Sequence, residues 1–184
     1  MVTSKQPFSG VEDPDFKQIF IDLPGVSPPF STRYTLRQSI YDEFTKQRLQ
    51  LKDDLATTCN TIALSLDVWT SSNSLPILAI IGHWLTAEFD YRQQVVEFTE
   101  LKGPHSGENM AAAVEACLLE LDLAPKLVSI TGDNAANNET MVSDLYHRLA
   151  RIRLQGKQEL RFKGLDSYIR CLAHILNLIV KDIL

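Results

Sequence analysis

The sequence predicts an α/β fold in which helices pack on a mixed sheet. Three successive strand-like segments are separated by short turns, which favours a three-strand antiparallel meander. Apolar and polar residues alternate in the first segment, and the other two are apolar runs. A helical segment then leads to a fourth strand-like segment, and such a crossover favours parallel pairing. With 184 residues, of which 45% are hydrophobic and 22% charged, the chain is long enough for one well-buried domain.

Residues 1–34 are expected to form a flexible lead-in, and residues 35–184 the folded domain. The lead-in is rich in Pro, Ser and Asp, and the pairs Pro24-Gly25 and Pro28-Pro29 interrupt regular structure. Only one short helix, near Phe16 to Ile21, is expected there.

The folded domain is expected to open with a helix from Thr35 to about Cys59, because apolar residues recur there at helical spacing. Thr35 is the expected N-cap, and the helix is expected to pack against the sheet. Strands are expected at residues 61–68, 76–86, 91–101 and 127–131. Further helices are expected at residues 106–121, with Ser106 as N-cap, at 135–151 and at 168–184, with a polar irregular segment at 154–167.

This order of elements matches the first part of a ribonuclease H-like fold, in which the first and fourth strands lie side by side and parallel. Asp67 is expected to end the first strand and Asp133 the fourth. Because parallel strands end at the same edge of a sheet, the two carboxylates are expected to meet there.

Two converging carboxylates favour metal-assisted chemistry on phosphates. Mg²⁺ prefers hard oxygen ligands, and a pair of such ions can stabilise both the attacking and the leaving oxygen of a phosphoryl transfer. A third carboxylate normally completes such a site. The alternative is that Asp67 only caps a strand and that Asp133 only makes an Asx-turn before its helix.

The residues around these aspartates resemble the motifs of the hAT-family transposases, particularly the fungal members. Three segments carry the resemblance, which extends over roughly residues 28–184: Ser65-Leu66-Asp67-Val68-Trp69-Thr70-Ser71, Ile130-Thr131-Gly132-Asp133-Asn134-Ala135-Ala136-Asn137 and Arg170-Cys171-Leu172-Ala173-His174-Ile175-Leu176-Asn177-Leu178. The segment Ser31-Thr32-Arg33-Tyr34-Thr35-Leu36 is similar to the lead into the family's catalytic domain. Gly132, inserted before the second aspartate, departs from the family pattern.

The resemblance implies that Asp67 and Asp133 are the first two catalytic, metal-binding members of a D-D-E triad that uses Mg²⁺ or Mn²⁺. It implies that Trp69, Asn134, Cys171 and His174 lie near this site, with Trp69 following the first strand. It further implies transposon-end DNA as partner and a nuclear location. For Cys171 and His174 two other interpretations stay open, a zinc site, which needs four ligands, and a buried thiol beside a hydrogen-bonded imidazole.

The sequence departs from the family pattern in lacking a late catalytic Glu after a helical insertion. We therefore expect a truncated catalytic core that is inactive alone. An alternative is a transposase-derived, non-enzymatic DNA- or protein-binding module, with the apolar last helix as a protein-docking surface. A weaker alternative is a ribonuclease H-like nuclease of another family.

The net charge of −5 and a pI of about 5.3 do not favour nucleic-acid binding by the chain as a whole, so any such contact must be local. One basic cluster is expected to lie beside the metal site and to bind phosphates: Arg148, Arg151, Arg153, Lys157, Arg161 and Lys163. The alternative is a solvated helix end and loop. No signal peptide and no apolar run long enough to span a membrane is recognised, and three distant cysteines fit a reducing compartment.

Overall fold

The computed structural model describes residues 7–23, 25–103, 106–133, 135–153 and 159–183. The chain divides into two compact units, Met1–Leu51 and Lys52–Leu184. None of the described helices is long and apolar enough to cross a membrane.

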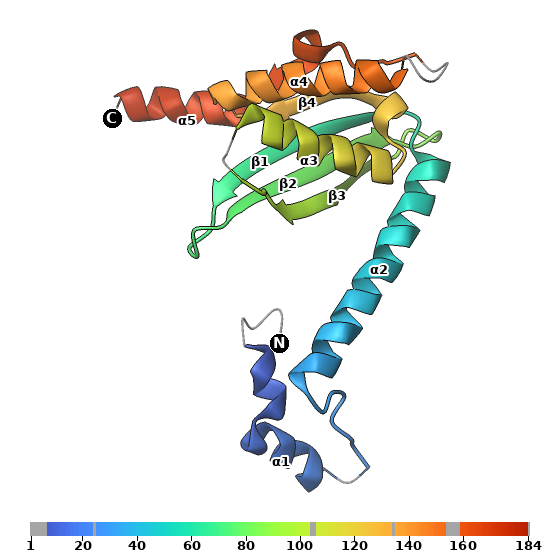
Figure 1. Ribbon diagram of the computed structural model, residues 1–184, viewed down its shortest axis with the longest axis vertical. Coiled ribbons are helices and arrows are strands. Elements are labelled where there is room, and N and C mark those ends of the chain that lie inside the picture. The colour runs from blue at the N-terminus through green and yellow to red at the C-terminus, as the bar shows by residue number, and fades with distance from the viewer. Residues whose placement is uncertain (1–6, 24, 104–105, 134, 154–158, 184) are drawn as a thin grey trace. The chain divides into compact units, whose positions relative to one another are not determined.

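The first unit is helical. It contains a 3₁₀ turn, η1 (Phe8–Glu12), the helix α1 (Pro14–Asp22) and most of the long helix α2 (Arg33–Thr58) (Figure 1). Asp13 caps α1, because its carboxylate accepts hydrogen bonds from the backbone N–H groups of Asp15 and Phe16. The single short helix expected before residue 35 is confirmed, and η1 precedes it.

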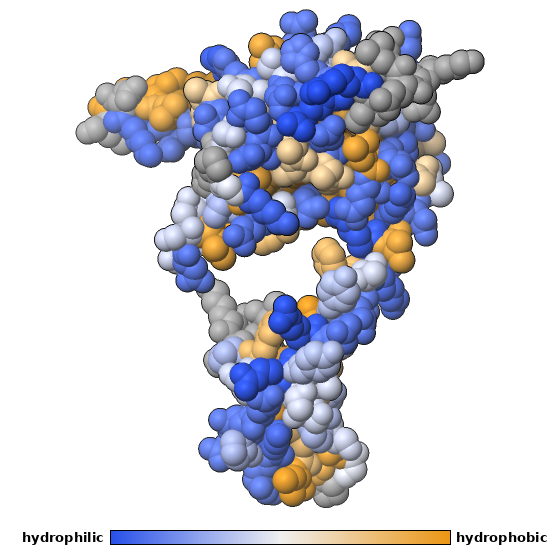
Figure 2. Space-filling view, viewed as in Figure 1, coloured by the Kyte–Doolittle hydropathy of each residue, from blue (hydrophilic) through white to orange (hydrophobic). Residues whose placement is uncertain are grey.

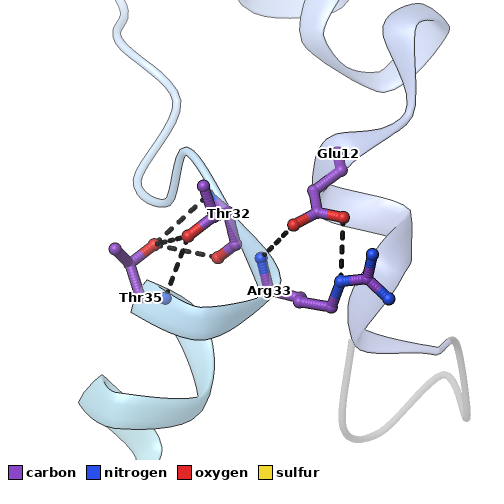
Figure 3. Close-up of polar contacts among 4 residues, drawn as sticks. All are labelled: Glu12, Thr32, Arg33 and Thr35. Atoms are coloured by element: carbon purple, nitrogen blue, oxygen red, sulfur yellow. Dashed lines mark hydrogen bonds and ion pairs between the residues drawn. The ribbon is translucent and has the colours of Figure 1, made fainter.

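The start of α2 is fixed by a reciprocal cap (Figure 3). The Thr35 N–H donates to Thr32 Oγ1 at 3.1 Å, and the Thr32 N–H donates to Thr35 Oγ1 at 3.2 Å. Glu12 accepts from the Arg33 N–H at 2.9 Å and forms an ion pair with Arg33 Nε at 3.0 Å. The expectation that Thr35 is the N-cap was wrong, because α2 begins two residues earlier and Thr32 caps it.

The second unit is built on a five-stranded mixed sheet with the order β3-β2-β1-β4-β5. β1 pairs antiparallel with β2 and parallel with β4, β2 pairs antiparallel with β3, and β4 pairs parallel with β5. The strand bounds are β1 (Ile62–Thr70), β2 (Pro76–Leu85), β3 (Tyr91–Glu100), β4 (Leu127–Gly132) and β5 (Tyr168–Arg170). The predicted α/β fold, with its antiparallel meander and its parallel fourth strand, is confirmed.

Two details of the strands differ from expectation. β1 does not end at Asp67 but continues to Thr70, because β2 supplies pairing partners as far as Pro76, so Asp67 and Trp69 lie inside the strand. The last helix does not begin at residue 168. Tyr168–Arg170 instead pairs with β4 as β5, and α5 (Leu172–Ile183) follows it.

The helices α3 (Gly107–Glu120) and α4 (Ala136–Arg153) lie together on one face of the sheet (Figure 1). Ser106 caps α3 as expected, since its hydroxyl accepts from the Asn109 N–H. The core lies between these helices and the alternate strand residues that face them, including Leu64, Ile80, Val114 and Leu145, which are at most 1% exposed. On the opposite face, large apolar side chains of β3 and β5 stay exposed.

Only the last turns of α2, from Lys52 onward, belong to the second unit. There Trp84 Nε1 donates to Thr58 Oγ1 at 3.2 Å, and Lys126 Nζ donates to the Leu55 carbonyl at 2.9 Å. The apolar residues that recur at helical spacing in α2 are not buried along the whole helix: Ile40 is 36% exposed and Phe44 is 60% exposed.

The N-terminal turns of α3 and α4 touch at Gly107, which is buried. A Cβ placed at Gly107 would lie 2.6 Å from Thr140 Cβ, 2.7 Å from the Met141 nitrogen and 2.8 Å from the Asn137 carbonyl oxygen. Two of these neighbours are backbone atoms that cannot move independently, so only glycine permits this close approach.

We expect Gly107→Ala to lower the free energy of unfolding by about 1–3 kcal/mol, because the new methyl group overpacks the contact between the two helices. Urea denaturation of the full chain measures the change. Glu108→Gln, at the exposed neighbouring position, is the control and should stay within about 0.5 kcal/mol of wild type. Equal stability of Gly107→Ala and wild type would contradict the close packing.

Candidate functional site

The parallel pairing of β1 and β4 brings Asp67 and Asp133 to the same edge of the sheet. The register pairs Leu64 with Ile130 and Ser65 with Thr131, so two further steps along each strand lead to Asp67 and Asp133. Asp133 follows directly after β4, as expected. We call this end of the sheet the carboxylate edge.

Asp133 is held in place by its surroundings. Its Oδ1 accepts from the Ala135 N–H at 3.0 Å, which closes an Asx-turn, and from Asn138 Nδ2 at 2.5 Å. Its backbone carbonyl accepts from Asn138 Nδ2 and from the Tyr168 hydroxyl. The Asx-turn of the alternative interpretation is therefore present. Since it engages Oδ1, it leaves Oδ2 as the oxygen with which Asp133 can bind a further group.

Asn138 and Tyr168 bind Asp133, and the sequence analysis did not single them out. Asn138 is 6% exposed, and a buried amide signals a specific partner. Tyr168 comes from β5, which sequence periodicity did not reveal. Burial raises the pKa of the Tyr168 phenol, and the negative charge of Asp133 raises it further. The hydrogen bond with Asn138 lowers this pKa, but burial has the larger effect. Tyr168 is therefore a hydrogen-bond donor at neutral pH.

Asp67 differs from Asp133 because its side chain is exposed. Its carboxylate makes no hydrogen bond or ion pair within the described ranges, and its cross-strand partner is the small residue Ala79. An accessible carboxylate opposite one that is held in orientation fits the oxygen chemistry that Mg²⁺ and Mn²⁺ prefer. A third acidic, His or Cys ligand in the same group is not found among the described residues.

Trp69 lies two residues beyond Asp67, on the same face of β1. Its ring is in tilted contact with that of Phe98 on β3, with 5.7 Å between the ring centroids. The expectation that Trp69 follows the strand was wrong, but its nearness to Asp67 holds. Asn134 lies outside the described residues.

Cys171 is also at the carboxylate edge, and His174 follows it in the first turn of α5. The Cys171 N–H donates to the Gly132 carbonyl at 2.8 Å, next to Asp133, and the Ile175 N–H of α5 donates to the Cys171 carbonyl. Both side chains are half-buried, and Cys171 is a free thiol. Within the described part of the chain, no ligand set for zinc includes them and no hydrogen bond of the His174 ring is found.

Arg148 and Arg151 of the basic cluster do not lie beside the carboxylate edge, contrary to the expectation for these two residues. Asp133 adjoins the start of α4, whereas Arg148 and Arg151 lie about 18 and 23 Å along its axis at 1.5 Å per residue. Arg161 and Lys163 are exposed on either side of the buried Phe162. The adjoining Gly164 packs on Tyr146, in the second half of α4.

Arg148 has a structural role. Its Nε lies 2.6 Å from Asp144 Oδ2 and its Nη1 3.0 Å from Glu115 Oε2, which ties α4 to α3. Hydrogen bonds to Asp144 and Glu115 raise the pKa of this guanidinium further. Arg151 is exposed, the Arg153 side chain and Lys157 fall outside the described part, and phosphate contacts by the cluster remain predictions.

Arg170 is a basic residue at the carboxylate edge, where it pairs with Gly132 in the β4–β5 register. Its Nη2 lies 2.6 Å from Glu139 Oε1 in the first turn of α4. The sequence analysis placed Arg170 within a motif but gave it no role.

The helix α5 begins at this edge and carries an exposed apolar stripe (Figure 2). The stripe consists of large apolar side chains that are each at least 48% exposed: Leu172, Leu176, Ile179, Val180 and Ile183. They recur at helical spacing, as an interaction face would.

Comparison with known proteins identifies a family and several relatives. A family model described as ZBED1 RNase-like domain matches residues 65–160. A putative AC transposase of Zea mays is 26% identical over 182 residues, which cover 99% of this chain and 22% of the relative. No solved structure matches the chain.

Two further relatives come from a fungus and from rice. A putative transcriptional regulator, tpeD, of Talaromyces stipitatus is 26% identical over 100% of this chain and 21% of its own length. The zinc finger BED domain-containing protein RICESLEEPER 2 of Oryza sativa is 28% identical over 82% of this chain and 20% of its own length. The chain thus spans about a fifth of the length of these relatives.

We expect Asn138→Ala to lower the free energy of unfolding by about 1–3 kcal/mol, because it removes the donor that binds both the carbonyl and Oδ1 of Asp133. Urea denaturation measures the change. Asn177→Ala, at an exposed position of α5, is the matched control. A loss no larger than that of the control would show that the Asx-turn alone orients Asp133.

Proposed function

Since this chain belongs to the ZBED1 RNase-like domain family, within the hAT group of transposase-related proteins, we propose that it forms part of a metal-dependent catalytic core acting on DNA phosphates. Asp67 and Asp133 are the two metal-binding carboxylates in this proposal. The observation that carries it is the β1–β4 register, which directs residues 66 positions apart (133 − 67) to one edge of the sheet.

The environments of the two carboxylates suit different tasks. Asp133 is oriented by Ala135 and Asn138, so its remaining oxygen would bind a cation with little loss of side-chain entropy. Asp67 is exposed and can approach the same cation from β1. Bound Mg²⁺ or Mn²⁺ would supply charge stabilisation for the attacking and leaving oxygens at phosphorus.

Strand cleavage and transfer are proposed only for a site that a third ligand completes. The third ligand is not found among the described residues, and two carboxylates alone do not fix two cations in productive geometry. Residues 1–184 are therefore expected to bind the metal ion without cleaving DNA. DNA as partner and action in the nucleus belong to the same proposal, which the transposase and BED-finger relatives support.

Asp67→Asn is expected to weaken Mn²⁺ binding at least tenfold, since it removes one of two charged ligands. Water-proton relaxation during Mn²⁺ titration of the full chain measures the affinity. Asp90→Asn makes the same change of charge at the exposed β2–β3 turn, where no ligand role is proposed, and should match wild type. If Asp67→Asn titrates like wild type, the proposed metal site is wrong.

A second candidate function is non-enzymatic DNA binding, which the exposed Arg161 and Lys163 favour. Neither side chain belongs to the proposed pair of metal-binding carboxylates, so this contact would need no metal ion. The apolar stripe of α5 would also act without a metal ion. A protein partner would bind there by covering Leu176 and Ile179.

In this second case, the double variant Arg161→Gln/Lys163→Gln should weaken binding to a 20-base-pair duplex. The slope of log affinity against log salt concentration should fall by about 2, since each lost phosphate contact removes about 0.9. Fluorescence anisotropy with EDTA present measures both. Arg37→Gln/Lys46→Gln on α2 removes the same charge elsewhere and should leave the slope unchanged; an equal effect of the two double variants would reject a local contact.

A further inference from the structure

The strand β3 forms one edge of the sheet, and the direction of its backbone groups follows from its pairing with β2 (Figure 1). The Leu101 N–H donates to the Pro76 carbonyl at 2.8 Å, so the Leu101 backbone faces β2. Successive residues of an antiparallel strand alternate between facing the partner strand and facing away from it. The N–H and C=O groups of Phe98 and Glu100 therefore point away from β2, toward the open edge.

A side chain of β3 occupies one of these outer groups. Glu97 Oε1 accepts from the N–H of Phe98 at 2.9 Å, and this N–H is one with which an added strand would pair. A neutral carbonyl is a weaker acceptor than a carboxylate, so Glu97 keeps unrelated strands from the edge. A cationic side chain can attract the carboxylate and release the N–H.

A groove lies between the second half of β3 and the helix α3. Its volume is about 450 Å³, and residues of both elements line it. Thr99 and Leu101 line it from β3, and three small side chains of α3, Ala112, Ala113 and Ala116, line it from the helix. Because a wall of alanines takes up little room, another backbone can come close to the strand edge beneath it.

The charge of the groove indicates what can bind there. Its lining includes the carboxylates of Glu97, Glu100 and Glu120 together with the ammonium group of Lys102. This acidic balance repels nucleic acid and favours a basic partner. A second copy of the chain is disfavoured as well, because pairing of β3 with itself would bring Glu97 and Glu100 of both copies together.

We propose that the edge of β3 and this groove bind an extended basic peptide of another protein, which adds to the sheet as a further strand. The peptide backbone pairs with the outer N–H and C=O groups of Phe98 and Glu100, and every second peptide side chain enters the groove. This contact uses neither Asp67 nor Asp133, so it does not depend on the proposed function.

A lysine of the peptide fits the groove in two ways. Its methylene stem can lie on Ala112 and Ala116, while its ammonium group reaches the carboxylates of Glu97 and Glu120. By pairing with Glu97, the lysine also frees the Phe98 N–H for the peptide backbone. The capped edge thus selects for a basic strand over a neutral one.

A seven-residue peptide of alternating lysine and valine, with blocked ends and a fluorescent label, is the probe. Anisotropy should show that it binds the full chain, and replacing its lysines by glutamates should weaken binding at least about tenfold. Equal binding of the two peptides would overturn the proposal. So would the absence of lysine–valine peptide binding at about 1 mM protein.

Backbone methylation of the peptide tests the strand pairing itself, since only alternate N–H groups of an added strand face β3. One peptide is N-methylated at every valine and another at every lysine. One of the two should lose binding at least about tenfold, and the other should keep it within about threefold. Loss by both peptides, or by neither, would overturn addition to the sheet edge.

Ala116→Leu tests the groove, because the larger side chain fills it from an exposed position of α3. Binding of the lysine–valine peptide should weaken at least about tenfold. Ala56→Leu, at an exposed position of α2, is the matched control and should bind like wild type. Equal binding by the two variants would overturn the role of the groove.

Sedimentation of the full chain without peptide distinguishes a peptide from a second copy. Wild type and Ala116→Leu should sediment alike, since no pairing between copies at this edge is expected. Self-association that Ala116→Leu abolishes and Ala56→Leu does not would overturn the proposal in favour of β3 pairing between two copies of the chain.

Discussion

The parallel pairing of β1 with β4 is the constraint on which the rest of the second unit depends. A parallel neighbour requires a long crossover, and β2, β3 and α3 provide it between the two strands. The pairing also fixes which side chains face the helices. A slip of one residue would turn Leu64 outward and Ser65 inward, so burial of the apolar row sets the register and thereby the positions of both aspartates.

The structural and the chemical interpretations of Asp133 are compatible. Its Oδ1 starts α4 by closing the Asx-turn, and Asn138 and Tyr168 hold the same residue from a helix and a strand. A carboxylate used in this way loses one oxygen to the fold but gains a fixed direction for the other. Preorganisation of this kind would favour the proposed cation site.

The periodicity of hydrophobic residues predicted most of the fold, because residues that recur with strand or helix spacing lie on one face and are buried together. This periodicity failed where strand pairing, and not the residue pattern, decides the secondary structure. Asp67 was expected to end the first strand and Trp69 to follow it, yet β2 continues opposite both residues. Tyr168–Arg170 was expected to be helical, yet the edge of β4 is available for pairing. It also could not show that Arg148 is engaged with Glu115, since an ion pair between helices depends on tertiary packing alone.

The candidate site was only partly predictable. Sequence motifs show which residue types are present, but they do not show which face of the sheet each side chain occupies. Knowing that Trp69 lies near Asp67 does not reveal that Phe98 comes from β3 to meet it, which depends on two strand registers in succession. The same registers put an acidic edge beside an aromatic surface. The sequence around Asp67 could therefore predict its neighbour on β1 but not its neighbour on β3, because the second depends on the pairing of β2 with both strands.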